Sequence, residues 1–161
     1  MQPEFAIELL KALKANNIHT AIETTGFASP AIFRRIVEYL DLLFFDINHW
    51  DETKHKEKTF VSNIPILQNM KYAINIGKEV LPRLPVIPNY NNSIDDAQGF
   101  VQRLKEVGAE KVQLLPFHQF GENKYSMLGR DYEFSHTKVL HPEDLKDFQK
   151  VFVDAGIDAF F

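Results

Sequence analysis

Apolar positions follow two different periodicities, and these alternate along the whole chain. Stretches with apolar residues three and four positions apart predict amphipathic helices, and short continuous apolar runs predict strands. Helices are predicted to begin at or just after Pro3, Ser29, Ser62, Ser93 and Pro142. Strands are predicted over residues 19–23, 42–47, 80–87, 111–115 and 157–161.

Three segments fit this scheme less simply. The run LLFFDI (42–47) is apolar almost throughout, so we expect a strand that is buried on both faces. Pro82 and Pro85 weaken the strand prediction over 80–87, because proline cannot donate to a strand ladder. Residues 50–58 are polar, and residues 116–140 predict a long loop whose length favours a lid or a partner-contact segment over plain irregular surface.

The alternation predicts an α/β protein with a parallel sheet and helices packed outside it, either doubly wound or barrel-like. The 161 residues contain no repeat or linker, so we expect a single domain over 1–161. The chain begins with a helix, whereas a crossover helix normally follows a strand. We therefore expect that a strand is missing upstream.

Composition removes several classes of function. The chain has no cysteine, which excludes disulfides, thiolate zinc sites and iron–sulfur clusters held by its own residues, and fits a reducing compartment. A net charge of -4 with scattered Lys and Arg argues against a nucleic-acid surface. No apolar run approaches the roughly 20 residues that cross a bilayer, and the acidic start argues against a signal peptide. We expect a cytoplasmic protein without membrane attachment.

Polar side chains collect where the predicted strands end. Glu23 and Thr24 end the first strand, Asp46 ends the second, Arg83 lies on the third, and His118 follows the fourth. Reactive groups of parallel α/β folds sit at the carboxyl ends of strands. Two acids, an arginine and a histidine suit a zwitterionic ligand, since the acids can approach an amine or bound cation and the arginine a carboxylate.

Each of these residues also has an ordinary structural explanation. Glu23 alone is more simply a turn residue or helix cap, Arg83 could pair with an acid on a neighbouring helix, and His118 could be a satisfied loop histidine. Asp46 is harder to explain away, because an acid after LLFF must reach solvent or find a partner. Four ionisable groups on four consecutive strands together favour a ligand site.

A second polar cluster contains His49, Asp51, Glu52 and His55. Its spacing matches no metal-ligand pattern, and a solvated polar loop is the better interpretation. We therefore predict neither metal ligands nor catalytic residues within this chain.

Several stretches together resemble one known family over essentially the whole chain. They are IETTGF (22–27), FFDINHWD (44–51), RLPVIPNYNNS (83–93), QLLPFHQFGENKY (113–125), LGRDYEF (128–134) and the ending DAGIDAFF. In this order and spacing they resemble the C-terminal portion of the glycyl-radical-enzyme activating enzymes. These are radical S-adenosylmethionine proteins typified by the pyruvate formate-lyase activating enzyme.

The resemblance implies an incomplete (β/α)6 barrel, with the last four units and the closing segment in this chain. The family's first strand leads to a CxxxCxxC loop that holds a 4Fe–4S cluster, and its second leads to a GGEP-type loop. Neither motif is present here. The resemblance places Met1 just downstream of the GGEP loop, which would explain both the missing strand and the absent cysteines.

The resemblance also implies S-adenosylmethionine-binding roles for the residues at the strand ends. Glu23 and Thr24 match an acid–Thr pair near the methionyl end of the cofactor, and Asp46 matches the first residue of a DxK motif. Arg83 matches an arginine that contacts the cofactor, and His118 a histidine on the adenosyl side.

Two residues depart from the family pattern. Glu23 stands where the pyruvate formate-lyase activator has Asp, so a monovalent-cation site found there cannot be assumed. Asn48 stands where DxK has Lys, so the contact made by that lysine cannot be assumed either.

The implied activity of the intact protein is hydrogen abstraction from a glycine Cα of a partner glycyl radical enzyme, such as pyruvate formate-lyase or a relative. An electron donor such as flavodoxin or ferredoxin would serve the cluster, and this chain alone is expected to be inactive.

Two alternatives stay open. One is a non-catalytic module that docks a glycyl radical enzyme, and the other is an unrelated barrel enzyme acting on a small anionic metabolite through Arg83 and His118.

The missing upstream strand also has a structural consequence. The strand at 21–23 should form an unpaired sheet edge that promotes self-association.

Overall fold

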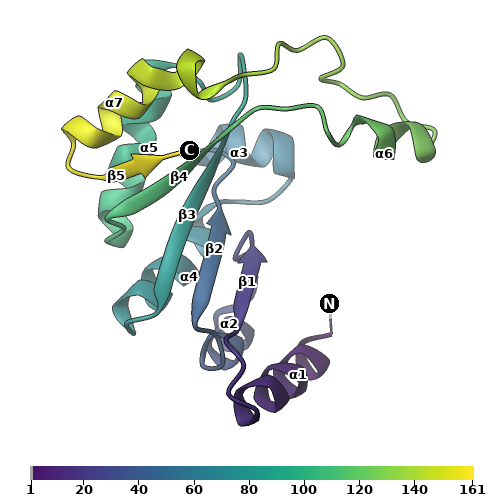
Figure 1. Ribbon diagram of the computed structural model, residues 1–161, viewed down its shortest axis with the longest axis vertical. Coiled ribbons are helices and arrows are strands. Elements are labelled where there is room, and N and C mark those ends of the chain that lie inside the picture. Colours follow the sequence, from purple (N-terminus) through teal and green to yellow (C-terminus); the bar gives the residue numbers. More distant parts are fainter. Residues whose placement is uncertain (1) are drawn as a thin grey trace.

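A computed structural model describes residues 2–161 of the chain. Five parallel strands form one sheet in the order in which they occur in the sequence (Figure 1). They are β1 (Ala21–Thr24), β2 (Leu42–Asp46), β3 (Glu79–Val86), β4 (Lys111–Pro116) and β5 (Asp158–Phe160). The prediction of an α/β protein with five parallel strands is confirmed, with strand ends shifted by at most two residues.

One helix precedes β1, and the others connect consecutive strands. They are α1 (Pro3–Ala15), α2 (Pro30–Val37), α3 (Glu52–Thr59), α4 (Ile64–Asn75), α5 (Ile94–Val107), α6 (Glu122–Met127), the 3-10 helix η1 (Pro142–Leu145) and α7 (Lys146–Asp154). A capping box is present at α5, where Ser93 and Asp96 each accept a hydrogen bond from the other's backbone N–H. The hydroxyl of Ser29 accepts from the N–H of Ile32 at the start of α2.

The two faces of the sheet differ in burial. One face is sealed by α2, α4, α5 and α7, and its strand residues are completely buried: Leu43, Phe45, Leu84, Val86, Val112 and Leu114. The alternate residues Phe44, Leu81 and Gln113 stay only partly buried on the other face. The prediction that 42–47 is buried on both faces is therefore wrong, because the helices that form the core all pack on one side.

Two prolines lie inside β3, a central strand of the sheet. Pro82 is in register with Phe45 of β2, and Pro85 with Leu115 of β4. Successive N–H groups of a strand point to opposite sides, so donors lost three residues apart fall on different neighbours. Each ladder therefore loses no more than one hydrogen bond, which explains how β3 keeps both partners.

The polar stretch after β2 forms the helix α3, so the predicted solvated loop is wrong. Asp51 caps the helix by accepting from the N–H of Lys54 at 2.9 Å, and Phe60 ends it in the left-handed conformation. His49 and His55 are buried, at 0% and 1% exposure. The helix is polar on nearly every side, which hid it from periodicity, and its capping aspartate was the sequence feature that could have revealed it.

The segment after β4 is the long excursion that the sequence predicts, although it includes the short helix α6. We call residues 117–141 the arm. Figure 1 shows it leaving the end of β4, reaching out to α6 and returning toward η1. Gln119 ties its two limbs together, because its side-chain N–H groups donate to the carbonyls of Phe134, Ser135 and Thr137 at 2.9–3.0 Å.

β1 is an edge strand of the sheet, as the sequence suggested, whereas the predicted self-association remains a prediction. Among residues 2–161, no helix is long and apolar enough to span a membrane.

Candidate functional site

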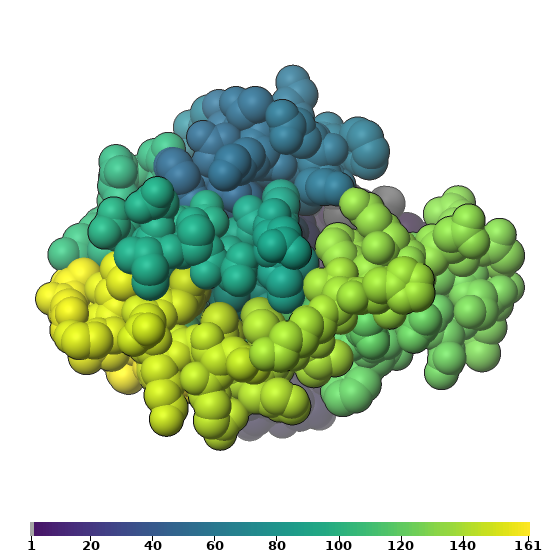
Figure 2. Space-filling model, turned by 90° about the horizontal axis from the view of Figure 1, so that it is seen from above, coloured from purple at the N-terminus to yellow at the C-terminus, as the bar shows by residue number. Residues whose placement is uncertain are grey.

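The residues predicted to form the site lie at one edge of the sheet. Glu23 and Thr24 end β1, Asp46 ends β2, and Arg83 is paired in register with Asp46 on β3. His118 follows the end of β4 by two residues. All five strands are parallel, so these positions share the carboxyl end of the sheet, which Figure 2 shows from above.

Arg83 is the centre of an ion-pair cluster that joins three strands. Its Nε donates to Oδ1 of Asp46 at 2.8 Å, and its Nη2 donates to Oδ2 of Asp46 at 3.2 Å and to Oε2 of Glu23 at 3.0 Å. The guanidinium also lies 5.3 Å from the ring centre of Phe44. The alternative that Arg83 pairs with an acid of a neighbouring helix is not observed among residues 2–161.

The cluster combines a well-shielded arginine with carboxylates of increasing exposure. The side chain of Arg83 is 15% exposed, that of Asp46 30% and that of Glu23 67%. Hydrogen bonding to Arg83 lowers the pKa of Glu23, and the two carboxylates raise the pKa of Arg83. Two carboxylates and one guanidinium together give the cluster a formal net charge of minus one.

The cluster also leaves one donor group of the arginine available. Within residues 2–161, Nη1 of Arg83 makes no hydrogen bond, while Nε and Nη2 are both engaged. The cluster can attract a cation through its two carboxylates and bind a carboxylate through Nη1 of Arg83. It therefore suits an amino-acid-like ligand.

Thr24 and His118 do not take part in this cluster. The hydroxyl of Thr24 accepts from the N–H of Gly26 at 2.9 Å and shapes the turn after β1. His118 is exposed, its Nδ1 accepts from the N–H of Phe120 at 3.3 Å, and its ring packs on that phenylalanine at 4.2 Å between ring centres. Contacts therefore unite three of the five predicted residues.

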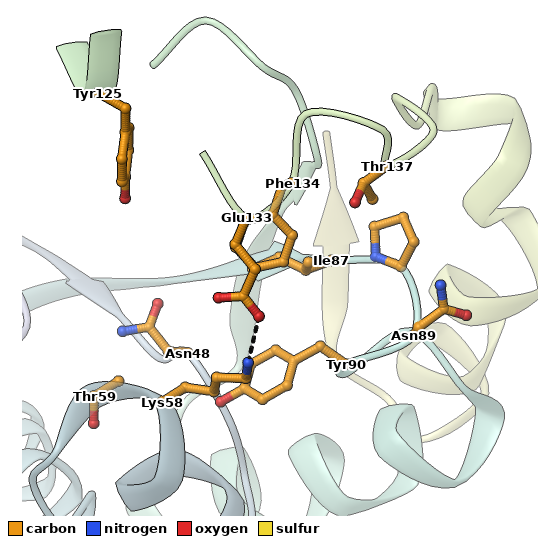
Figure 3. A pocket seen from close by; sticks show the side chains of 11 residues that line it. Asn48, Lys58, Thr59, Ile87, Asn89, Tyr90, Tyr125, Glu133, Phe134 and Thr137 are labelled. Atoms are coloured by element: carbon orange, nitrogen blue, oxygen red, sulfur yellow. Dashed lines mark hydrogen bonds and ion pairs between the residues drawn. The ribbon is translucent and has the colours of Figure 1, made fainter. Parts of the chain in front are cut away.

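A cavity next to this edge was not foreseen from the sequence. It has a volume of about 540 Å³ and is bounded by Asn48 in the loop after β2, the end of α3, the turn after β3 and the arm (Figure 3). Its polar lining includes Asn48, Asn89, Lys58 and Glu133. Asparagines two or three residues after the ends of β2 and β3, as in FDIN and VIPN, were the available sequence sign.

Behind the cavity lies a buried histidine with an unusual environment. His49 packs between Trp50, Tyr90 and Phe100, and its Nδ1 accepts from the N–H of Asp51 at 3.0 Å. The proton of the neutral ring is therefore on Nε2, which lies 3.7 Å from Oδ1 of Asp96 and has no hydrogen-bond partner among residues 2–161. Burial lowers the pKa of His49, so the ring is neutral at pH 7.

No metal site is found in the part of the chain that the structure describes. Residues 2–161 contain no group of three or more histidine, cysteine, aspartate or glutamate side chains that could hold an ion. The two buried histidines serve the fold instead: Nδ1 of His55 lies 2.8 Å from the carbonyl of Val61.

Comparison with known proteins gives a consistent result. No family model matches the chain. The 4-hydroxyphenylacetate decarboxylase activating enzyme of Clostridioides difficile (strain CD196) is 38% identical over 163 residues, covering 99% of this chain and 51% of the relative. The choline trimethylamine-lyase activating enzyme of Oleidesulfovibrio alaskensis is 37% identical over 150 residues, covering 91% of this chain and 48% of the relative.

Solved structures share the fold at lower identity. A crystal structure of a domain of pyruvate-formate lyase-activating enzyme from Bacteroides vulgatus matches with a TM-score of 0.80 at 23% identity, covering 99% of this chain and 91% of that one. A crystal structure of Streptococcus suis SuiB bound to S-adenosylmethionine matches with a TM-score of 0.65 at 13% identity, covering 96% of this chain and 34% of that one.

The chain spans about half the length of the curated relatives that it matches. The match to the first of them covers 99% of this chain, so it includes the strand ends on which the Arg83 cluster lies. The sequence is thus homologous to the activating enzymes of glycyl radical enzymes, and corresponds to about half of such a protein.

Proposed function

We propose that this chain is the S-adenosylmethionine-orienting part of an enzyme that activates a glycyl radical enzyme. The observation that carries the proposal is the Arg83 cluster, which joins two carboxylates and a guanidinium at the carboxyl end of three parallel strands. The homology to activating enzymes supports the same assignment. The chain would correspond to the last four units of a (β/α)6 barrel.

The charges of the cluster fit the methionyl end of S-adenosylmethionine. The carboxylates of Glu23 and Asp46 can attract its ammonium and sulfonium groups, and Nη1 of Arg83 can donate to its carboxylate. Thr24 and His118 complete the proposed set, with His118 on the adenosyl side. When bound and reduced, this cofactor supplies a carbon-centred radical that removes hydrogen from a glycine Cα, while the protein orients the reactants and excludes water.

Other parts of the proposed activity must come from outside these residues. The chain has no cysteine, so thiolate ligands for a 4Fe–4S cluster cannot come from it. An electron donor such as flavodoxin or ferredoxin would reduce that cluster, and the need for a strong reductant makes a cytoplasmic location part of the proposal. The chain alone is expected to be inactive.

Calorimetric titration of the chain with S-adenosylmethionine tests this proposal. We expect binding that weakens for S-adenosylhomocysteine, which lacks the sulfonium charge, and that falls about tenfold or more in Arg83→Met. Arg35→Met is the matched control, because Arg35 is also paired with a carboxylate, that of Glu4, but on the helices α1 and α2. Equal affinity of the two variants would contradict the proposal, and so would equal affinity for the two ligands.

A further inference from the structure

His49 is a buried titratable group that neither the Arg83 cluster nor the cavity uses. Its ring is completely buried in the loop between β2 and α3, and its Nδ1 accepts from the N–H of Asp51 at 3.0 Å. Its Nε2 lies 3.7 Å from Oδ1 of Asp96, too far for a hydrogen bond, and is unpartnered among residues 2–161. Buried polar groups are nearly always hydrogen-bonded, so this donor needs a physical explanation.

The backbone next to His49 is held by other parts of the fold. The side-chain amide of Asn63 donates to the carbonyls of His49 and Trp50 at 3.0 and 3.1 Å. Nε1 of Trp50 donates to Oδ1 of Asp96 at 2.9 Å, which ties the loop to α5. The backbone and the indole are therefore fixed, whereas the imidazole of His49 has a partner on one side and a carboxylate within reach on the other.

Asp51 connects His49 to α3. Its N–H donates to His49, and its carboxylate caps α3 by accepting from the N–H of Lys54. The helix has no apolar stripe, so its stability depends on its ends. Near the other end of α3, Lys58 pairs with Glu133 of the arm at 2.7 Å. A change at His49 therefore reaches the arm through the helix.

Charged and titratable groups face the ring from each element packed against it. They are Asp51 of the loop, Lys54 of α3, Tyr90 of the turn after β3 and Asp96 of α5. Burial lowers the pKa of His49 below its ordinary value of 6.5, Asp96 opposes this shift, and Lys54 adds to it. The folded chain therefore takes up this proton only below pH 6.5.

Protonation removes one partner of the ring and strengthens the attraction to the other. The new proton on Nδ1 faces the N–H of Asp51, and two donors cannot form a hydrogen bond with each other. The charged ring is attracted to the carboxylate of Asp96, and a shift of roughly 1 Å brings Nε2 within hydrogen-bond distance. Each protonation state of the ring therefore has its own partner.

We propose that His49 is a pH-dependent switch that fastens the start of α3, and through α3 the arm, only while its ring is neutral. The neutral ring holds the N–H of Asp51. The protonated ring binds Asp96 instead, Asp51 loses its hydrogen bond, and α3 and the arm loosen together. The proposal concerns the chain without any ligand, so it does not rest on the proposed function.

Nuclear magnetic resonance of the nitrogen-labelled chain between about pH 7.5 and about pH 5, without ligand, tests the switch. The imidazole of His49 should carry a proton on Nε2 alone at neutral pH and on both nitrogens in acid. Because the ring binds its proton more weakly in the fastened state, acid shifts the equilibrium toward the loosened state. Hydrogen exchange of the α3 amides, corrected for the intrinsic effect of pH, should become about tenfold faster with the same midpoint, whereas β3 should keep its protection.

Two results of this titration would overturn the proposal. One is protonation of His49 that leaves the exchange of the α3 amides unchanged. The other is a ring that stays neutral until the whole chain unfolds, as expected for a purely structural histidine.

The arm gives a second readout. The backbone signals around Glu133 should move with the same midpoint as those of α3, because Lys58 links the two segments. In Lys58→Met, α3 should still respond to acid while the arm no longer follows it. Arm signals that ignore the opening of α3 in the parent chain would overturn the coupling between His49 and the arm.

Two histidine variants separate the switch from a structural role. His49→Asn places an amide oxygen close to the position of Nδ1, where it accepts from Asp51 but takes up no proton in this pH range, so α3 should keep its protection in acid. His55→Asn is the matched control, because His55 is also buried and its Nδ1, 2.8 Å from the carbonyl of Val61, is replaced by an amide that donates. The control should still lose protection in acid. An equal pH response of the two variants would refute the proposal.

Asp96→Asn keeps the switch testable if His49→Asn does not fold. The amide oxygen still accepts from Nε1 of Trp50, but the negative charge that favours the protonated ring is gone. The midpoint of the α3 transition should therefore shift to lower pH. Asp95→Asn, which removes an exposed acid from the same turn of α5, should leave the midpoint in place. A midpoint that moves equally in both variants, or stays fixed in Asp96→Asn, would contradict the change of partner.

Discussion

The two faces of the sheet use the same strands for opposite purposes. On the helix-covered face, Phe45 is completely buried and packs edge-on against Phe33 of α2. On the open face, its neighbour Phe44 supports the guanidinium of Arg83. One residue step along β2 therefore separates a side chain that stabilises the fold from one that positions a charged group. Whether a side chain stabilises the fold or serves the site therefore depends on which face of the strand it occupies, more than on its position along the chain.

The largest effect on stability is expected for a substitution of Phe45, and it tests this difference between the two faces. Phe45→Ala should lower the free energy of unfolding by about 3–5 kcal/mol, because a fully buried ring leaves a cavity in a packed core. Phe44→Ala should cost only about 1 kcal/mol, since its ring is partly exposed already. Urea unfolding followed by circular dichroism measures both. Losses of similar size would show that the open face contributes to the core as much as the covered face does.

A second effect concerns the turn that leads out of β1. Gly26 has φ 70°, and a Cβ there would overlap the buried ring of Phe45. Gly26→Ala should therefore cost about 2–4 kcal/mol, from backbone strain and overpacking together. Gly77→Ala is the matched control, because Gly77 has φ 78° with open space around it, and should cost about 1 kcal/mol. If the two variants unfold at the same urea concentration, the overlap between the added Cβ at position 26 and the ring of Phe45 does not lower the stability.

The helix-covered face was the part that the sequence predicted well. Apolar periodicity places Phe33, Leu104 and Phe152 on buried helix stripes, and short apolar runs locate all five strands. The same rule failed at α3, where the only buried side chain is His55 and no apolar stripe exists. The periodicity of apolar residues indicates which side chains are buried. It therefore cannot predict a helix such as α3, which is stabilised by its caps and one buried histidine.

The open face was predictable only in part. The ends of parallel strands had to share one edge, so grouping Glu23, Asp46 and Arg83 followed from topology alone. The rotamers that bring Arg83 onto both carboxylates, and the turn of the arm that directs His118 onto Phe120, depend on tertiary packing. The cofactor roles of these residues and the single-domain prediction for 1–161 stay predictions.

A third and smaller effect compares two arginines that are each paired with carboxylates. Arg83→Met should lower the free energy of unfolding by about 1–2 kcal/mol, because it leaves the partly buried carboxylate of Asp46 without its donors. Arg35→Met breaks an exposed pair with Glu4 and should change stability much less. Chemical unfolding of the two variants at the same ionic strength measures the difference. A larger loss in Arg35→Met would mean that the Arg83 cluster is held mainly by the backbone around it.

The smallest effect should be a pH dependence that belongs to Glu23. Arg83 lowers the pKa of Glu23 in the folded state, so the ionised carboxylate stabilises the fold above its unfolded pKa, about 4.3, and this contribution disappears as pH falls through the folded value. Glu23→Gln should therefore have a lower thermal midpoint than the parent chain at pH 7, and the gap should close on acidification below pH about 4. In an Arg83→Met background the same substitution should leave no pH-dependent gap, because the charge that shifts the pKa is gone. If the difference in thermal midpoint persists in that background, another cation must lower the pKa of Glu23. The ion pair between Glu23 on β1 and Arg83 on β3 would then not be the contact that holds Glu23.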